Sequence, residues 1–121
     1  MTGDTTQVDL SRDECVRRLG AAELARVLIS VRCLPTALPT RVRLVDQDLA
    51  LLDSDDDAVV QAARRHDVLT VQVDGVDDGH PWSVVASGIS SLAPLDPAAS
   101  SPTHDHRLIT LPLAVVVGQR H

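Results

Sequence analysis

Apolar and polar residues alternate along most of the chain, which is the pattern of β-strands that bury one face. Short clusters of Pro, Gly, Asp and Ser interrupt the alternation and are typical of turns. Six strands are therefore predicted, at residues 25–33, 37–45, 49–52, 68–73, 82–92 and 106–118. We expect the first two to form a hairpin that turns at 34–36, and the fourth and fifth to form another across the acidic loop 74–81. Pro112 predicts a bend or an edge position in the last strand.

Two short helices are predicted from the residues that would begin them. Ser11 and Glu14 have the capping-box spacing, so a helix is expected over about residues 12–21, with its three arginines in solvent. The acidic cluster at 55–57 predicts a second helix over about residues 56–65, because carboxylates interact favourably with the free amides of a helix start.

The length of 121 residues suits one domain. We expect a polar tail at residues 1–9, a single domain at 10–121, and a loop rich in Pro, Ala and Ser at 96–103. No apolar run approaches the roughly 18 residues that cross a bilayer, and the amino terminus is acidic and polar, unlike a signal peptide. A cytoplasmic location is therefore expected.

Composition excludes several kinds of chemistry. All 11 basic residues are arginines, and the chain has neither Lys nor Tyr, which excludes Schiff-base catalysis and acid catalysis by a phenol. The formal net charge of −6 argues against nucleic acid or an anionic membrane as a partner. Cys15 and Cys33 are too few for a disulfide framework, and we interpret both as reduced core thiols.

Metal and nucleophile motifs are not recognisable in the sequence. His104 and His106 would share one face of a strand, but no third ligand is specified, so no metal site is predicted. The acidic cluster at 55–57 lacks the spacing of a calcium loop. Because no catalytic triad, phosphate-binding loop or dinucleotide fingerprint can be assembled, any enzymatic chemistry would come from a cofactor.

A series of short matches along residues 9–120 carries a family resemblance. The series is Leu10-Ser11 and Glu14-Cys15 at the first helix, Ala25-Arg26-Val27 in the first strand, Leu38-Pro39 in the second, Val73-Asp74 before the acidic loop, Trp82-Ser83-Val84 with Gly88 after it, and residues 109–118 at the end. In this order the chain resembles the small flavin-binding split barrels of the pyridoxamine 5'-phosphate oxidase-like superfamily.

The resemblance implies a mostly β fold, a six-stranded antiparallel split β-barrel with two short helices. It also implies a homodimer in which FMN lies in a groove at the subunit interface. The residues expected to contact the cofactor are Pro39, Thr40, Arg41, Asp53, Ser54, Trp82 and Ser83.

The phosphate end of this groove departs from the family pattern. Relatives usually carry an Arg near the end of the third strand and a Gly-Ser-Lys-type turn before the next helix, which give cations and amides to the flavin phosphate. Here Leu52 and Ala58 replace the expected phosphate cations, and the acidic cluster at 55–57 adds negative charge, so weak FMN binding is predicted. Arg41 and Arg43 project to one side of their strand. They would reach a phosphate or an acidic ligand from across the groove, or else are solvated charges on an outward face.

Two functions follow. The first is an FMN-dependent oxidoreductase of a small molecule, with a weakened phosphate site. The alternative is a homodimeric barrel without a cofactor that acts as a ligand-binding or interaction module. The sequence names neither a substrate nor an electron donor.

Overall fold

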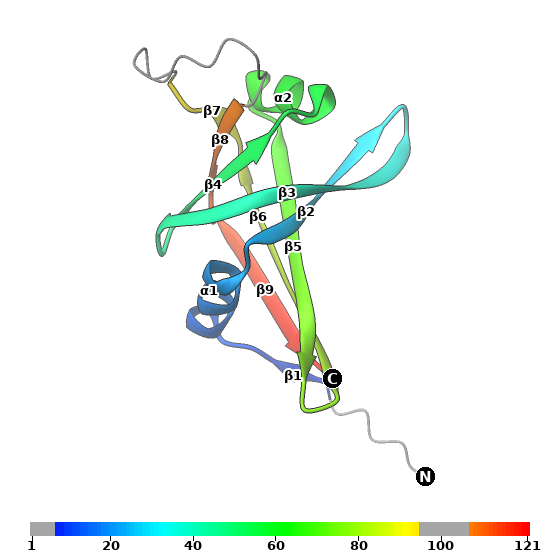
Figure 1. Ribbon diagram of the computed structural model, residues 1–121, viewed down its shortest axis with the longest axis vertical. Helices are drawn as coiled ribbons and strands as arrows, with labels where there is room; N and C mark the ends of the chain where they lie inside the picture. Colours follow the sequence, from blue (N-terminus) through cyan, green and yellow to red (C-terminus); the bar gives the residue numbers. More distant parts are fainter. Residues whose placement is uncertain (1–6, 95–106) are drawn as a thin grey trace.

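The computed structural model describes residues 7–94 and 107–121 as one antiparallel sheet that curls into a barrel, with a helix near each end (Figure 1). The strands are β1 (Val8–Asp9), β2 (Leu24–Val31), β3 (Leu34–Asp46), β4 (Leu49–Ser54), β5 (Val68–Asp77), β6 (His80–Ile89), β7 (Ser91–Leu92), β8 (Arg107–Pro112) and β9 (Val115–Arg120). Neighbouring strands follow the order β1-β9-β6-β5-β2-β3-β4-β8-β7. The mostly β fold class is therefore confirmed.

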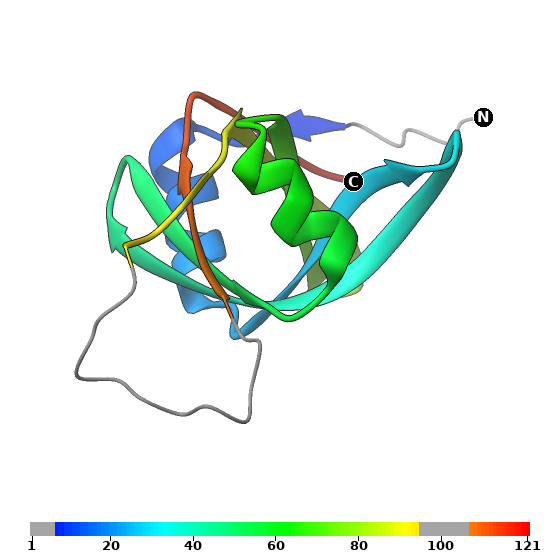
Figure 2. The same ribbon diagram turned by 90° about the horizontal axis from the view of Figure 1, so that it is seen from above.

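Two bent strands close the barrel. Ser90 separates β6 from β7, and residues 113–114 separate β8 from β9, so that each pair forms one strand with a bend. Because β6 pairs with β9 while β7 pairs with β8, the ring of strands is complete (Figure 2). Nine strands are distinguished in the described residues. Counted as continuous bent strands and without β1, they are the six predicted, and the bend expected at Pro112 is confirmed.

Both predicted helices form, as α1 (Arg12–Ala21) and α2 (Asp57–Arg64). The Ser11 hydroxyl caps α1 by accepting a hydrogen bond from the Glu14 amide at 3.2 Å. The Glu14 carboxylate does not complete the expected reciprocal box, because it accepts hydrogen bonds from Arg17 and Arg18 instead. Seen from above, α2 lies across one mouth of the barrel (Figure 2).

The two hairpin turns differ from prediction. The first lies at Arg32 and Cys33, both with positive φ (52° and 66°), and not at 34–36. The second contains only Asp78 and Gly79, with φ of 47° and 81°. The rest of the expected acidic loop 74–81 is strand, paired as far as Asp77 opposite His80. Both are two-residue turns of the kind whose twist matches that of paired strands.

The core fills the barrel and continues under both helices. Cys15 and Leu19 of α1 and Val59 and Ala63 of α2 are buried with the inward-facing residues of the strands. Burial raises the pKa of the Cys15 thiol and so keeps it neutral. Cys33 is exposed at the hairpin turn, so the expectation of two core thiols is wrong for Cys33.

The first strand of the sheet lies within the segment predicted as a polar tail. Val8 and Asp9 pair with Arg120 and Gln119, so the sheet begins two residues before the predicted start of the domain at residue 10. The predicted loop 96–103 lies outside the described residues. Within the described ranges, none of the helices has the length and apolarity needed to span a membrane.

Candidate functional site

The outer face of β3 and β4 carries a small pocket between cationic and apolar side chains. Arg41 and Arg43 are two residues apart on β3, so both side chains leave the strand on its outer side. In the sheet, Arg41 is opposite Asp53 and Arg43 is opposite Leu51, and Asp53 is opposite Leu108 of β8. Together with Val42 these residues line a pocket of about 290 Å³.

Charge in this pocket is positive on balance. Arg41 and Arg43 are both exposed, and neither forms an ion pair within the described part of the chain. Among the described residues that line the pocket, Asp53 supplies the one carboxylate. Two guanidinium groups beside one carboxylate leave a net charge of +1, which favours an anionic ligand.

Two of the predicted contact residues face the barrel interior and have structural partners. The Thr40 hydroxyl is buried and donates to the carbonyl oxygen of Asp53 at 2.9 Å, which ties β3 to β4. The Ser54 hydroxyl accepts from the Asp56 amide at 3.2 Å, at the point where β4 leads into α2. Since each hydroxyl is engaged inside the protein, neither lies on the face that Arg41 occupies.

The amino terminus of α2 is occupied by its own side chain. The Asp56 carboxylate accepts hydrogen bonds from the amides of Ala58 (2.9 Å) and Val59 (3.2 Å). Asp55 and Asp57 are exposed beside it. Two of the amides that could bind an anion at this helix start are therefore already used, and three carboxylates lie beside them.

Leu52 lies on the inward face of β4. Its side chain is fully buried in the barrel core, between the outward-facing residues Leu51 and Asp53. A cation at this position would point into the core and could not reach a ligand on the outer face. Leu52 is therefore not a position from which a side chain reaches the outer-face pocket, and its match to a phosphate-binding cation of relatives stays a prediction.

Trp82 and Ser83 lie on opposite faces of β6, because successive residues of a strand alternate. Trp82 packs under α1, where the Arg18 guanidinium lies 4.6 Å from the ring centroid. Ser83 faces outward, opposite Asp74 of β5 and Gln119 of β9. The two side chains thus cannot contact the same face of one ligand.

Arg18 is the centre of a cluster that joins α1 to the β5–β6 hairpin. Only 13% of its side chain is exposed, so its predicted position in solvent is wrong. It donates to Asp77 at 2.6 Å and to Glu14 at 3.1 Å. The hydrogen bond from Arg18 lowers the pKa of Asp77, and the hydrogen bond from Arg17 lowers that of Glu14, so both carboxylates stay ionised well into the acid range.

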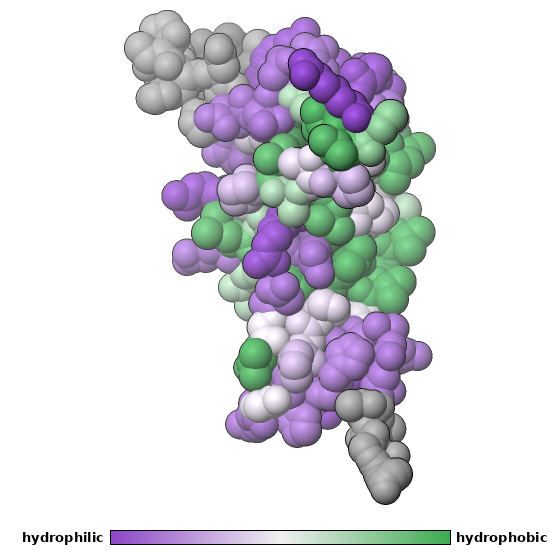
Figure 3. Space-filling model, turned by 90° about the vertical axis from the view of Figure 1, so that its right-hand side faces the viewer, coloured by the Kyte–Doolittle hydropathy of each residue, from purple (hydrophilic) through white to green (hydrophobic). Residues whose placement is uncertain are grey.

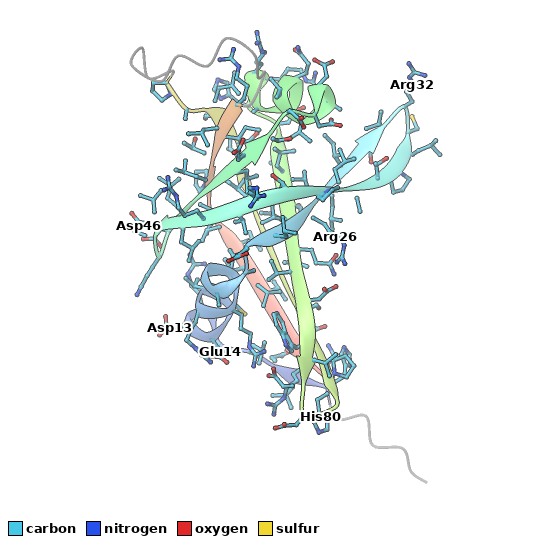
Figure 4. All side chains as sticks on the ribbon, viewed as in Figure 1. Asp13, Glu14, Arg26, Arg32, Asp46 and His80 are labelled. Atoms are coloured by element: carbon cyan, nitrogen blue, oxygen red, sulfur yellow. The ribbon has the colours of Figure 1, made fainter. Side chains whose placement is uncertain are left out.

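Pro39 lies beside a second pocket on the outer surface. This pocket has a volume of about 240 Å³ and lies between β3, β2 and β5. Arg26, opposite Pro39 in the sheet, forms an ion pair with Asp74 at 3.0 Å and projects away from the barrel (Figure 4). Its charge is therefore already partnered, unlike that of Arg41.

Comparison with known proteins identifies the family. The sequence profile described as pyridoxamine 5'-phosphate oxidase matches residues 11–112, which is most of the chain. The chain belongs to this family. No curated protein matches the sequence.

Solved structures support the family fold. An FAD-binding protein from Mycobacterium smegmatis is 20% identical, with a TM-score of 0.74 and coverage of 96% of this chain and 99% of that one. An FAD-binding protein from Mesorhizobium loti is 18% identical, with a TM-score of 0.79 and coverage of 97% and 99%. A putative pyridoxamine 5'-phosphate oxidase from Corynebacterium glutamicum is 19% identical, with a TM-score of 0.73 and coverage of 95% and 98%. At these identities the similarity establishes the split-barrel fold.

Within this family member, Arg41 and Asp53 are the predicted contact residues that the structure brings together. Sequence reasoning missed Leu51 and Leu108, the apolar sides of the pocket. The alternation of β4 carries the signal for Leu51, which has the same parity as Asp53. Nothing in the sequence pairs Leu108 with β4, because that contact joins strands far apart in the chain.

Metal ligands do not gather in the described residues. No group of three or more His, Cys, Asp or Glu side chains lies close enough there to hold an ion. His104 and His106, the pair weighed from the sequence, lie outside the described ranges.

Proposed function

We propose that this family member binds a flavin nucleotide on the outer face of β3 and β4, and that the bound flavin oxidises or reduces a small molecule. The pocket of Arg41, Arg43, Leu51 and Leu108 carries the proposal. A flavin nucleotide joins a flat, largely apolar ring system to an anionic phosphoryl tail. The pocket offers apolar side chains and two cations side by side, which suits both parts.

A second copy of the chain would complete the groove. The pocket of about 290 Å³ lies at the lower limit for a drug-sized ligand, and a flavin nucleotide is larger. A homodimer, predicted from the family resemblance, would add the missing wall. We therefore propose that the chain forms a homodimer. We also propose a cytoplasmic location.

An apolar outer surface on the strands that continue the sheet from β3 through β2 supports dimer formation. Its exposed residues are Leu28 of β2, Val68 of β5, Ile89 of β6, and Val115 and Val117 of β9. These strands are neighbours in the order β9-β6-β5-β2. Figure 3 shows apolar surface in the middle of the molecule between two hydrophilic ends. Such a surface is typical of a subunit interface.

Chemistry in this proposal belongs to the cofactor. A bound flavin supplies hydride transfer, while the protein binds, orients and shields it. Arg41 and Arg43 would hold the anionic end, and Leu51 and Leu108 would exclude water from the ring system. FMN is the flavin expected from the sequence. Two of the similar structures are named FAD-binding proteins, which makes FAD an equal candidate.

One observation favours a different function. The start of α2 holds Asp55, Asp56 and Asp57, and the Asp56 side chain already occupies its amides. A barrel that had lost its cofactor would have no need of phosphate-binding groups there. This supports a homodimeric module that binds another ligand or a partner through the same surfaces.

The deciding experiment is a flavin titration of the purified chain. The visible spectrum of the isolated protein is recorded first, and FMN, FAD, riboflavin and a deazaflavin are then titrated by fluorescence. Saturable binding in the low micromolar range would support the flavoprotein. Colourless protein that binds none of the four would overturn it in favour of the cofactor-free module.

A further inference from the structure

We propose that Arg41 and Arg43 are the phosphoryl-binding residues of this chain and replace the start of α2 in that role. The proposal rests on the proposed function, since the phosphoryl group is that of the bound flavin nucleotide. It places the anionic end of the ligand on the face of β3, several residues before the helix that would otherwise receive it.

Geometry supports a two-point contact. Positions 41 and 43 lie about 7 Å apart along an extended strand, so two guanidinium groups leave the same face side by side. Both line one pocket with Leu51 and Leu108. A guanidinium presents a planar set of donors that matches phosphoryl oxygens, and two of them can grip one group from both sides.

Most of the other arginines among the described residues form ion pairs. Ion pairs engage Arg12, Arg17, Arg18, Arg26 and Arg65. Arg32 projects from the tip of the β2–β3 hairpin, far from the pocket on β4 (Figure 4). Arg41 and Arg43 combine exposure, absence of an ion pair within the described residues, and a shared pocket.

The carboxylate of Asp53 reduces the positive charge of the pocket and would repel an anionic ligand. Its carboxylate shares the lining with the two arginines, opposite Arg41 in the sheet. Arg43, by contrast, is opposite Leu51 of β4, and Leu51 is opposite Thr110 of β8. Neither of these neighbours across the sheet is acidic. We therefore expect Arg43 to contribute at least as much to anion binding as Arg41.

The start of α2 is poorly suited to bind the same anion. Hydrogen bonds from the amides of Ala58 and Val59 go to the Asp56 carboxylate, so these two donors are not available to an anion. Two further carboxylates, Asp55 and Asp57, would repel a phosphoryl group. Removing them should leave flavin affinity unchanged within about twofold if the anion lies on β3.

The test compares Arg41→Gln, Arg43→Gln and the double variant with Arg64→Gln. Arg64 is an exposed residue at the end of α2, so its loss changes the net charge equally without touching the pocket. FMN and FAD affinities should fall roughly tenfold for each pocket arginine, and riboflavin, which lacks a phosphoryl group, should change less than twofold. The control should match the wild type. Thermal melts of every variant verify that it is folded.

The outcomes separate the two proposals. Flavins that bind every variant equally, or a control that loses as much as the pocket variants, would overturn the arginine subsite and leave the flavoprotein intact. A tenfold gain in flavin affinity for the double variant Asp55→Asn, Asp57→Asn would indicate that the anion binds at the start of α2, and would also overturn the subsite.

If the wild type binds no flavin, inorganic pyrophosphate at 1–10 mM, a range on the order of weak anion affinities, becomes the probe. A rise in melting temperature that the double variant loses would sustain an anion subsite for another phosphorylated ligand. No rise would overturn it together with the flavoprotein.

Discussion

The guanidinium group of Arg18 stacks on the indole ring of Trp82, 4.6 Å from the ring centroid. The contact joins the first helix to a hairpin more than sixty residues later in the chain. Asp77 completes it by accepting a hydrogen bond from Arg18 at 2.6 Å. Trp82 is therefore engaged in holding α1 against the barrel, on the face of β6 opposite to Ser83.

Arg18→Ala should destabilise the fold, because it removes the ring contact and the link between α1 and the β5–β6 hairpin. The ring contact alone contributes about 1 kcal/mol. Arg18→Lys should recover part of the loss, since lysine keeps the charge but not the planar stacking. Chemical denaturation checks both. Arg17→Ala is the matched control, since its side chain is 72% exposed and pairs only with Glu14 within the described residues. A control loss as large as that of Arg18→Ala would contradict the assignment.

Acid should weaken this same cluster. The hydrogen bond from Arg18 lowers the pKa of Asp77 below its ordinary value of 3.8, so the folded state binds the proton less readily than the unfolded state. The stabilisation is fully present above that ordinary value and is lost as pH falls through the lowered one. The melting temperatures of wild type and Asp77→Asn should therefore differ by a constant amount near pH 7 and converge below about pH 3.8. A difference that persists at pH 2 would contradict this origin.

Gly88→Ala should be among the most damaging single changes in the barrel. A Cβ at this position on β6 would overlap the carbonyl oxygen of Pro112, where β8 ends. Backbone cannot move aside as a side chain can, so we expect a loss of about 3 kcal/mol in unfolding free energy. Gly20→Ala is the control. Its new methyl group meets the flexible end of Leu44 and gains helix propensity, so the change should stay within about 1 kcal/mol.

Val117→Glu should dissociate the proposed homodimer. Val117 is 53% exposed on β9, beside Val85 of β6 in the apolar surface, and a carboxylate there would be desolvated on association. Light scattering coupled to size exclusion should report twice the chain mass of 12.9 kDa for wild type and the single mass for the variant. Val76→Glu, near the end of the β5–β6 hairpin, should remain dimeric. A monomeric wild type would contradict the dimer.

Local signals in the sequence located the helices and most strands. The Ser11 cap and the carboxylates before α2 act within one helical turn, so the bounds of α1 and α2 were predictable. The turn at Arg32 and Cys33 was not, because neither residue type favours positive φ and the pairing of the long β2–β3 hairpin imposes it. Asp78-Gly79 did carry the usual hairpin signal, and the long acidic segment around it concealed how far the strands extend.

The candidate site was predictable only in part, because it depends on which face each side chain occupies. Strand alternation places Arg41 and Arg43 together, but it also separates Arg41 from Thr40 and Trp82 from Ser83. The buried position of Leu52 follows from the same alternation along β4, which begins at Leu49 as predicted. Leu108 could not be foreseen, since the β4–β8 pairing joins residues more than fifty positions apart.

The bent strand formed by β8 and β9 also determines when this barrel can assemble during synthesis. It pairs with β4 through β8 and with β6 through β9, so the edges of both strands stay open until the ribosome has released residues 107–120. Long-range pairings of this kind form late and slowly. The nascent chain therefore exposes the unpaired edge of β4 until β8 is made and that of β6 until β9 is made, and this is the interval in which a chaperone would bind it or aggregation would begin.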